Sequence, residues 1–428
     1  MGRRLLAAVG ILVLLALAAA GALYWRNLRG LAPALLPAPQ DIAALIGTTR
    51  APAVNNTGFP LQLPPGFSIS VFAKDLGKPR VMSLAPDGSL LVSVPEDGKV
   101  LALYDRDGDG YAEDRVIVLE NLQQPHGLAW RCHELCTLYV AETHRVATYS
   151  YDISTRRGSF IKTILDLPDS GGHWTRTIMF LPSPREDELL VSIGSSCNVC
   201  REQDSRRASV MVVNYDGSNP RTFAHGLRNA VFMAIHPVDG RVWVTEMGRD
   251  LLGDELPPDE INIVEEDRNY GWPLCYGQNV HDTRFDDSVY KRNPCEVPLA
   301  YQSQLDLPAH SAPLGLAFIP EDPPRLAGAS GGEAGGWPED WWYDLLVAYH
   351  GSWNRSEPTG YKVVRFPLDA QGKPTGEPVD FIAGWLQGAR ALGRPVDILV
   401  QPGGTMYISD DKAGVIYRLY NSSVNATP

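Results

Sequence analysis

Residues 81–92, VMSLAPDGSLLV, form two apolar runs joined by a turn that contains Pro86, Asp87 and Gly88. The same pattern returns in residues 232–244, FMAIHPVDGRVWV, and in residues 398–408, ILVQPGGTMYI. Short apolar runs that alternate with such turns are typical of β-strands, and no long segment has the period of an amphipathic helix. The pattern therefore predicts a strand-turn-strand unit that recurs along the chain.

Weaker copies of the unit lie near residues 127–130, 178–182 and 315–320, which brings the number of units to six. Spacings of about 40 to 55 residues with several strands per unit are typical of a β-propeller. An array of β-sandwiches is the alternative, but its turns recur every 8 to 12 residues or so. We therefore predict an all-β, six-bladed β-propeller over residues 65–420. The last two spacings are longer, so we expect insertions there, including residues 328–336.

The two ends of the predicted propeller can close the ring. Residues 68–72, SISVF, precede the first unit, and residues 415–419, VIYRL, end the last one. Pairing these two strands would remove two exposed sheet edges. Residues 421–428 then form a short tail.

The N-terminus predicts a membrane anchor or a signal segment over residues 1–30. An uncharged apolar run extends from Leu5 to Trp25 and follows Arg3 and Arg4, so it is long enough to span a bilayer. Cleavage after a small-residue site is the alternative. Residues 31–64 are rich in proline and alanine and predict a tether. The propeller is then expected on the periplasmic face of the inner membrane, or free in the periplasm or secreted if the segment is cleaved.

The six cysteines fall into three close pairs, which favours disulfides in an oxidising compartment. The pairs are Cys132 with Cys136, Cys197 with Cys200, and Cys275 with Cys295. Two pairs have spacings that zinc sites also use, and free thiols are a further alternative. The Cys197-x-x-Cys200 motif is also typical of redox dithiols, but its surroundings lack the βαβ pattern of such sites.

The net charge of −12 and the pI of about 5.3 oppose binding to nucleic acid, which requires a basic surface. Any anionic ligand must therefore be held by individual arginines. Arg80, Arg228 and Arg394 precede the inner strands of three predicted units, and several guanidinium groups at one axis favour a polycarboxylate or phosphate ligand. Arg176 is a further candidate anion clamp. The alternative is that each arginine pairs with a carboxylate of a blade, such as Asp397.

Two histidines occupy equivalent positions at the entry of neighbouring units, His126 and His173. A neutral imidazole facing the channel can accept a proton from a hydroxyl group near neutral pH. A purely structural hydrogen bond is the alternative for either residue, and position within the unit does not choose between the two.

Two acidic loops are candidates for calcium binding. Asp105, Asp107 and Asp109, with Glu113 nearby, alternate as in a calcium loop, but Val116 stands where an EF-hand has glutamate. A structural ion or an ordinary turn between strands both remain possible there. The second loop, residues 250–260, carries so many carboxylates that an ion or an arginine must neutralise them.

Several motifs in order give the chain a family resemblance. They are His173, residues 226–229 (GLRN), 259–262 (DEIN), 269–273 (NYGWP), 350–355 (HGSWNR), 360–362 (GYK) and 409–414 (SDDKAG). The chain resembles the soluble pyrroloquinoline-quinone-dependent sugar dehydrogenases over about residues 65–420, and looks most similar to their L-sorbosone dehydrogenase branch.

The resemblance implies a six-bladed propeller whose channel holds the quinone, with His173 as the general base. It implies that Arg228 and Asn229 contact the cofactor and that backbone carbonyls of Gly248 and Arg249 hold calcium, which acts as a Lewis acid. Arg80, His126, Arg176, His350 and Arg394 are the further expected cofactor contacts. Two family positions differ: residues 349–351 stand where glucose-oxidising members have a lysine, which His350, Arg355 or Lys362 could replace, and Val396 stands where they have a second arginine.

The implied activity is oxidation of an aldose or aldehyde sugar by hydride transfer to pyrroloquinoline quinone. The expected partners are a sugar substrate and an electron acceptor such as a cytochrome c or a membrane quinone. A calcium-dependent lactonase or hydrolase is one alternative, because other propellers perform that chemistry with a channel metal. A non-catalytic binding scaffold is the other.

Overall fold

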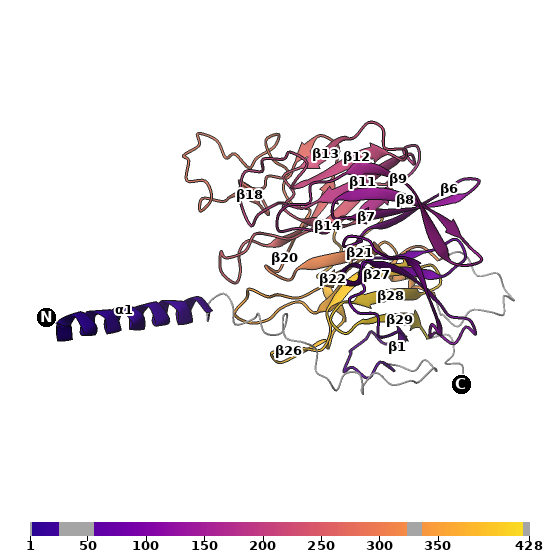
Figure 1. Ribbon diagram of the computed structural model, residues 1–428, viewed down its shortest axis with the longest axis horizontal. Helices are drawn as coiled ribbons and strands as arrows, with labels where there is room; N and C mark the ends of the chain where they lie inside the picture. Colours follow the sequence, from indigo (N-terminus) through magenta and orange to yellow (C-terminus); the bar gives the residue numbers. More distant parts are fainter. Residues whose placement is uncertain (1, 25–54, 323–335, 423–428) are drawn as a thin grey trace.

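The computed structural model describes residues 2–24, 55–322 and 336–422 (Figure 1). One α-helix, α1 (Gly2–Leu23), lies within the predicted N-terminal segment. Among the described residues, no helix combines the length and the apolarity that a membrane span requires. Most of the predicted tether, the insertion expected at residues 328–336 except Gly336, and the end of the tail lie outside the described residues.

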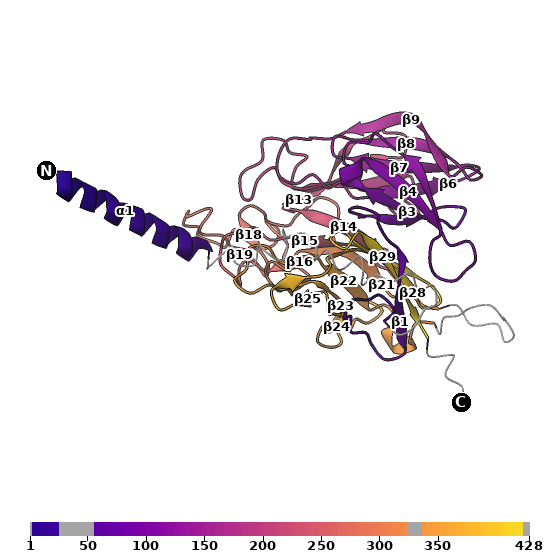
Figure 2. The ribbon, with the colours of Figure 1, turned by 60° about the horizontal axis from the view of Figure 1, so that its bottom comes forward.

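Six sheets of at least four strands form the blades of a propeller, as the sequence predicted. The first blade contains β2 (Met82–Leu84), β3 (Leu90–Val94), β4 (Lys99–Tyr104) and β5 (Asp114–Leu119). The second contains β6 (Leu128–Cys132), β7 (Cys136–Glu142), β8 (Arg145–Asp152) and β9 (Arg157–Asp166). The third contains β10 (Ile178–Phe180), β11 (Glu188–Ile193), β12 (Ser209–Asn214) and β13 (Arg221–His225), and β17 (Arg268–Asn269) pairs in parallel with β13. Figure 2 shows β9 at the outer edge of its blade.

The other three blades follow the same order from inside to outside. The fourth blade contains β14 (Ala230–Ile235), β15 (Val242–Glu246), β16 (Asp259–Val264) and β20 (Leu305–Leu307). The fifth contains β21 (Pro313–Phe318), β22 (Leu345–Tyr349), β23 (Lys362–Phe366) and β24 (Val379–Ile382). The sixth contains β27 (Pro395–Gln401), β28 (Thr405–Asp410), β29 (Val415–Asn421) and β1 (Phe67–Ala73). Two ribbons, β18 (Cys275–Tyr276) with β19 (Val280–His281) and β25 (Leu386–Gln387) with β26 (Arg390–Ala391), and two 3-10 turns, η2 (Pro95–Asp97) and η3 (Glu339–Trp341), lie in the connections.

The six predicted units all supply inner strands, namely β2, β6, β10, β14, β21 and β27. Each inner strand contacts the next one, and β27 contacts β2, so that the strands surround a common axis. The predicted closure is also confirmed, because β1 pairs antiparallel with β29 and Ile69 lies opposite Leu419 (Figure 1). Residues at the start of every inner strand are thereby brought to one end of one channel.

The core lies between neighbouring blades, which explains why the second strands have continuous apolar runs. β3, β15 and β22 are buried along their whole length, because each packs against a blade on both faces. Trp243 and Trp385 are among the largest fully buried side chains. The first of the two long spacings predicted from sequence, between the units near residues 232 and 315, contains the insertion between β16 and β20, which holds the ribbon β18–β19 and projects beyond the blades in Figure 1.

Ring closure predicts a large effect of truncating Ile69, which is fully buried in β1. We expect Ile69→Ala to lower the free energy of unfolding by about 2–5 kcal/mol, because it leaves a cavity between the first and last strands. Urea denaturation measures the change. The matched control is Val289→Ala, a fully exposed position where we expect a change within about 0.5 kcal/mol. Equal effects of the two substitutions would contradict the role of β1 in closing the ring.

Candidate functional site

An open cavity of ≈ 160 Å³ lies where the inner strands begin. Its lining comes from four blades and their entry loops: Arg80, Gly172, His173, Trp174, Thr175, Asn229, Val231, Met247, Leu314 and His350. Four residues predicted from the sequence, His173, Arg80, Asn229 and His350, therefore lie around one space.

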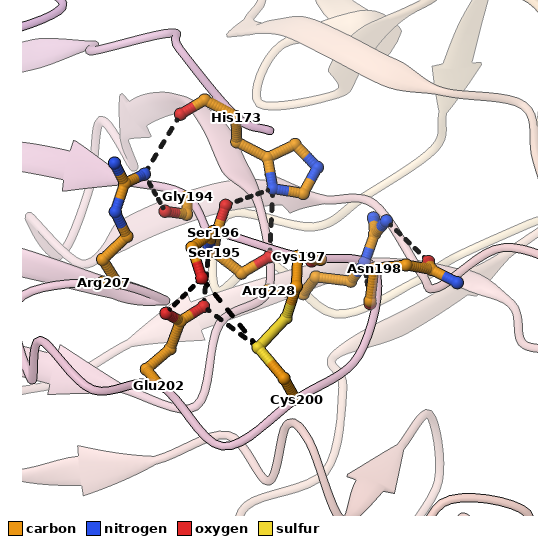
Figure 3. The surroundings of a disulfide bond; sticks show 10 residues. All are labelled: His173, Gly194, Ser195, Ser196, Cys197, Asn198, Cys200, Glu202, Arg207 and Arg228. Atoms are coloured by element: carbon orange, nitrogen blue, oxygen red, sulfur yellow. Dashed lines mark hydrogen bonds between the residues drawn. A yellow bond between two sulfur atoms is a disulfide. The ribbon is translucent and has the colours of Figure 1, made fainter. Parts of the chain in front are cut away.

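The imidazole of His173 has a defined orientation in this cavity. Its Nδ1 lies 2.8 Å from the carbonyl oxygen of Ser195 and 3.0 Å from the hydroxyl oxygen of the same residue (Figure 3). The Ser195 hydroxyl donates to the carbonyl oxygen of Cys197 at 2.6 Å. Because a carbonyl oxygen only accepts, Nδ1 must carry the proton, and Nε2 keeps its lone pair as a proton acceptor.

The pKa of His173 is lowered to about 3, first by burial and then by the positive charge of Arg228. Arg207 and Arg176 lower it further, whereas the hydrogen bond to Ser195 raises it. The imidazole is therefore neutral at physiological pH, which is the protonation state that a general base requires.

A close approach at Gly194 brings His173 and Asn229 together. A Cβ atom on Gly194 would lie 2.5 Å from Oδ1 of Asn229 and 2.6 Å from Cβ of His173. Any side chain at this position would therefore displace one of the two residues. Arg207 supports the same loop from behind, with its guanidinium 3.3 Å from the His173 carbonyl oxygen and 3.2 Å from that of Gly194 (Figure 3).

Arg228 lies behind Asn229 and lines a small neighbouring cavity of ≈ 20 Å³ together with Gly248 and Arg249. Its guanidinium donates to the carbonyl and side-chain oxygens of Asn198 at 2.8 and 3.0 Å, and pairs with Asp250 at 3.1 Å. The buried positive charge of Arg228 is therefore partly neutralised by Asp250. This agrees with the predicted alternative that an arginine neutralises the carboxylates of the acidic loop.

One of the two predicted calcium ligands, Gly248, contacts this same arginine. The carbonyl oxygen of Gly248 accepts a hydrogen bond from Arg228 at 2.9 Å, and the guanidinium of Arg249 pairs with Asp282 at 2.9 Å. A carbonyl oxygen has a second lone pair, so Gly248 can still serve as a metal ligand beside Arg228.

Arg80 and His350 share one carboxylate. Asp411 lies 2.7 Å from the Arg80 guanidinium and 2.8 Å from Nε2 of His350. Burial alone would raise the pKa of Asp411, but His350, Arg80 and Arg394 outweigh it and hold that pKa below its usual value. The prediction that Asp397 pairs with one of these arginines is wrong, because the two oxygens of Asp397 accept hydrogen bonds from the backbone amides of Met82 and Ile398.

Three predicted cofactor contacts lie outside the cavity lining. Arg394 donates to the carbonyl oxygens of His350 and Gly351 at 2.9 and 2.7 Å. Arg176 is fully buried and donates to the carbonyl oxygens of His173, Thr175 and Pro168. His126 is fully buried beside Trp174 and Phe232. The guanidinium groups of Arg394 and Arg176 therefore hold the backbone of the site, and direct contact of these three residues with a cofactor stays a prediction.

The structure also describes the two acidic loops and the three cysteine pairs. Ligand atoms of Asp105, Asp107, Asp109 and Glu113 lie within 4.8 Å of one another, so the predicted cluster exists, and its calcium stays a prediction. In the loop of residues 250–260, Arg355 pairs with Glu255 at 2.7 Å. All six cysteines form the predicted disulfides, and the zinc and free-thiol alternatives are wrong for these pairs: Cys132–Cys136, Cys197–Cys200 and Cys275–Cys295.

Five residues that position the site were not predicted, namely Gly194, Ser195, Asn198, Arg207 and Asp411. Four of them belong to the loop that contains the Cys197-x-x-Cys200 motif, and that motif was the sequence signal of a loop with a constrained conformation. Asp411 lay within a motif of the resemblance, but its pairing with two other blades depends on ring closure.

The model of the TrAA12-like family matches residues 61–422, which is most of the chain. The chain belongs to the TrAA12-like family. A pyrroloquinoline quinone-dependent pyranose dehydrogenase of Coprinopsis cinerea is 25% identical to it over 82% of this chain, which spans 53% of that relative's length. An uncharacterized protein of Borreliella burgdorferi is 28% identical over 85% of this chain and 92% of its own.

Solved structures share the fold of this TrAA12-like protein. An iodide structure of the family AA12 enzyme of Trichoderma reesei aligns with a TM-score of 0.70 at 21% identity and covers 86% of this chain and 99% of its own. The holo form of the quinone domain of the C. cinerea pyranose dehydrogenase gives 0.68 at 22%, with 86% and 99% covered. The predicted kinship with pyrroloquinoline-quinone-dependent sugar dehydrogenases is thus confirmed, but the matches do not specify the sorbosone branch.

The close approach at Gly194 predicts that this TrAA12-like protein does not tolerate a methyl group there. We expect Gly194→Ala to lower the free energy of unfolding by about 1–3 kcal/mol, because His173 or Asn229 must move. Urea denaturation measures this change. The control is Gly376→Ala, where the added atom would meet Pro367 at an ordinary 3.6 Å and the change should stay within about 0.5 kcal/mol. A Gly194→Ala protein as stable as the control would contradict the packing described.

The lowered pKa of His173 predicts a neutral Nδ1–H imidazole from pH 8 down to pH 5. Nitrogen NMR of histidine-labelled protein measures it, with the resonance assigned from its loss in His173→Gln. In the urea-unfolded chain the same residue should titrate near pH 6.5. Protonation therefore favours the unfolded state, so this residue's contribution to stability falls as pH decreases below about 6.5. A midpoint near 6.5 in the folded protein would refute the assignment.

Proposed function

We propose that this protein is a quinoprotein oxidoreductase that oxidises an aldose or aldehyde sugar, sorbosone-like or glucose-like, with pyrroloquinoline quinone and calcium. The observation that carries the proposal is the fixed tautomer of His173, whose Nε2 acceptor lies at a cavity that also contains Asn229 and Arg80. The names of the family's relatives support the cofactor and the substrate class.

The residues of the cavity fit an anionic planar cofactor. Arg80 lies on the cavity wall with its Nε buried and without a hydrogen-bond partner among the described residues, and the guanidinium lies 5.6 Å from the ring of Trp174. A carboxylate at this wall would gain a charge-assisted hydrogen bond. Asn229 offers an amide to a quinone oxygen, and Arg228 contributes positive charge from behind it.

Bound quinone supplies a two-electron acceptor for the hydrogen on the carbinol carbon, and calcium polarises it. Nε2 of His173 accepts the proton of the substrate hydroxyl. Ser195 holds the imidazole at Nδ1 throughout, which keeps Nε2 directed to the cavity. For the metal, we propose the backbone carbonyls of Gly248 and Arg249, which line the cavity beside Arg228.

The three disulfides support a location outside the reducing cytoplasm. We propose that the protein is exported, and that it acts in the periplasm, at the outer face of the inner membrane, or in the secreted state. Electrons would then leave to an external acceptor such as a cytochrome c or a membrane quinone.

A lactonase or hydrolase with a channel metal is less well supported. Such a metal needs several side-chain carboxylates or amides around it. The residues that line the cavity around His173 include no aspartate or glutamate in the described part of the chain, and Asn229 is the one amide. The neighbouring cavity contains the carboxylates Glu246, Glu260 and Asp282, but Arg228 and Arg249 line it too, and Arg249 pairs with Asp282. A binding scaffold would leave the fixed imidazole without a purpose.

Reconstitution tests the proposal directly. We expect purified protein with the quinone and calcium to reduce a redox dye when given aldoses or sorbosone, and removal of calcium by a chelator to abolish turnover. Absorbance of the bound quinone reports loading independently of turnover. A protein that neither changes the quinone spectrum nor oxidises any substrate of the panel would refute the function.

His173→Ala is expected to lower kcat by about 10²- to 10⁴-fold because it removes the proton acceptor. Quinone binding, followed by its absorbance, should remain. His133→Ala is the matched control, since His133 is exposed on the turn between β6 and β7. Undiminished kcat in His173→Ala would transfer the role of base to another group of the cavity, such as His350.

A further inference from the structure

We propose that the Cys197–Cys200 disulfide positions the base and the cofactor arginine, so that the enzyme is active with this bond formed and is switched off when a dithiol reduces it. This proposal rests on the proposed function, because it concerns the same site. It assigns a role to a pair of cysteines that the resemblance leaves without one.

The first branch of the argument leads from the disulfide to His173. The loop of residues 194–208 connects β11 to β12 and contains no helix or strand. Within it, the Cys197 carbonyl oxygen accepts the hydroxyl of Ser195 at 2.6 Å, and Ser195 in turn holds Nδ1 of His173 (Figure 3). Displacement of Cys197 therefore removes one anchor of Ser195, the residue that orients the base.

The second branch leads to Arg228 through the residue between the two cysteines. The carbonyl and side-chain oxygens of Asn198 accept two hydrogen bonds from Arg228, at 2.8 and 3.0 Å. The Asn198 side chain also accepts the backbone amide of Asp250 at 2.8 Å. One four-residue loop closed by a disulfide thus sets the position of both the imidazole and the buried guanidinium.

Hydrogen bonds hold parts of this loop, and the disulfide is the covalent link that closes its turn. Glu202 accepts the amide and hydroxyl of Ser196, both at 2.7 Å, and the Ser195 amide donates to the Arg228 carbonyl oxygen at 2.7 Å. Inside the turn, Asn198 is bound to Arg228 and Asp250, whereas Cys197 and Cys200 are tied to each other by the disulfide. Removing a link of this kind increases the number of conformations open to the loop.

The three disulfides of the chain differ in access and in what they touch. Cys197 and Cys200 are half-buried, so a small reductant can reach them. Cys132 and Cys136 are cross-strand neighbours in the β6–β7 hairpin, far along the chain from the site loops. Cys275 and Cys295 are buried in the insertion. The hairpin disulfide is therefore the matched control.

The redox step balances with a dithiol as the reductant. One thiolate of the reductant attacks a sulfur of the Cys197–Cys200 bond and forms a mixed disulfide, and its second thiolate then displaces the cysteine. Two electrons and two protons pass to the protein, which gains two thiols, and the reductant becomes a disulfide. The consequence is an enzyme that works only where disulfides persist.

The experiment compares Cys197→Ser/Cys200→Ser with Cys132→Ser/Cys136→Ser. We expect the first pair of substitutions to lower kcat by about 10- to 100-fold through misplacement of the base, and to weaken quinone binding. The hairpin variant should stay within about two-fold of wild type for both quantities. Nitrogen NMR of His173 in the protein without cofactor provides a readout that needs neither quinone nor sugar, and it should lose the single Nδ1–H signal in the first variant alone.

A dithiol titration covers the case in which the first variant does not fold. It uses the hairpin variant, which has one accessible disulfide, and thiol counting confirms that two thiols appear. The fall in kcat and the NMR change should develop together and reverse on oxidation. Unchanged kcat and an unchanged His173 signal after reduction would overturn the proposal. A wild-type protein that never binds quinone would instead refute the proposed function. The NMR comparison would still show whether the Cys197–Cys200 disulfide positions His173, because it needs no quinone.

Discussion

Pairing of β1 with β29 is the constraint on which the rest of the structure depends. It joins the first strand of the propeller to the last blade and places six inner strands around one axis. Arg80 then meets Asp411, although 331 positions separate them, and Asp411 meets His350 of a third blade. No local segment could assemble this group of residues, because each blade supplies one or two of them.

Buried guanidinium groups define the architecture around the cavity. Arg176, Arg207, Arg228 and Arg394 donate mostly to backbone carbonyl oxygens of the entry loops. A charge in a dry interior is costly unless its donors are satisfied, so these loops must adopt the conformation that presents their carbonyls. The arginines therefore determine the shape of the site, and the positive charge that remains attracts an anion.

The fold was predictable because its signal is periodic and repeated. Six copies of one strand-turn-strand unit, as in residues 81–92, located every inner strand, and two terminal apolar runs located the closure. The site was predictable only in part. Position in the unit could not distinguish His173, which lines the cavity, from His126, which is fully buried. The difference arises from packing between blades, because the ring of His126 lies against Trp174 and Phe232 of the following blades.

The weak basicity of His173 sets a requirement on the proposed cofactor. A general base works best when its pKa is near the working pH, but burial and the charges of Arg228, Arg207 and Arg176 lower the pKa of His173 to about 3. An anion bound against Arg228 would cancel part of that repulsion and raise the basicity of the imidazole toward the useful range. The same ligand that accepts the hydride would then activate the base. The protein without its cofactor holds a neutral, weakly basic imidazole, so under the proposed function cofactor binding and the basicity of His173 would be coupled through Arg228.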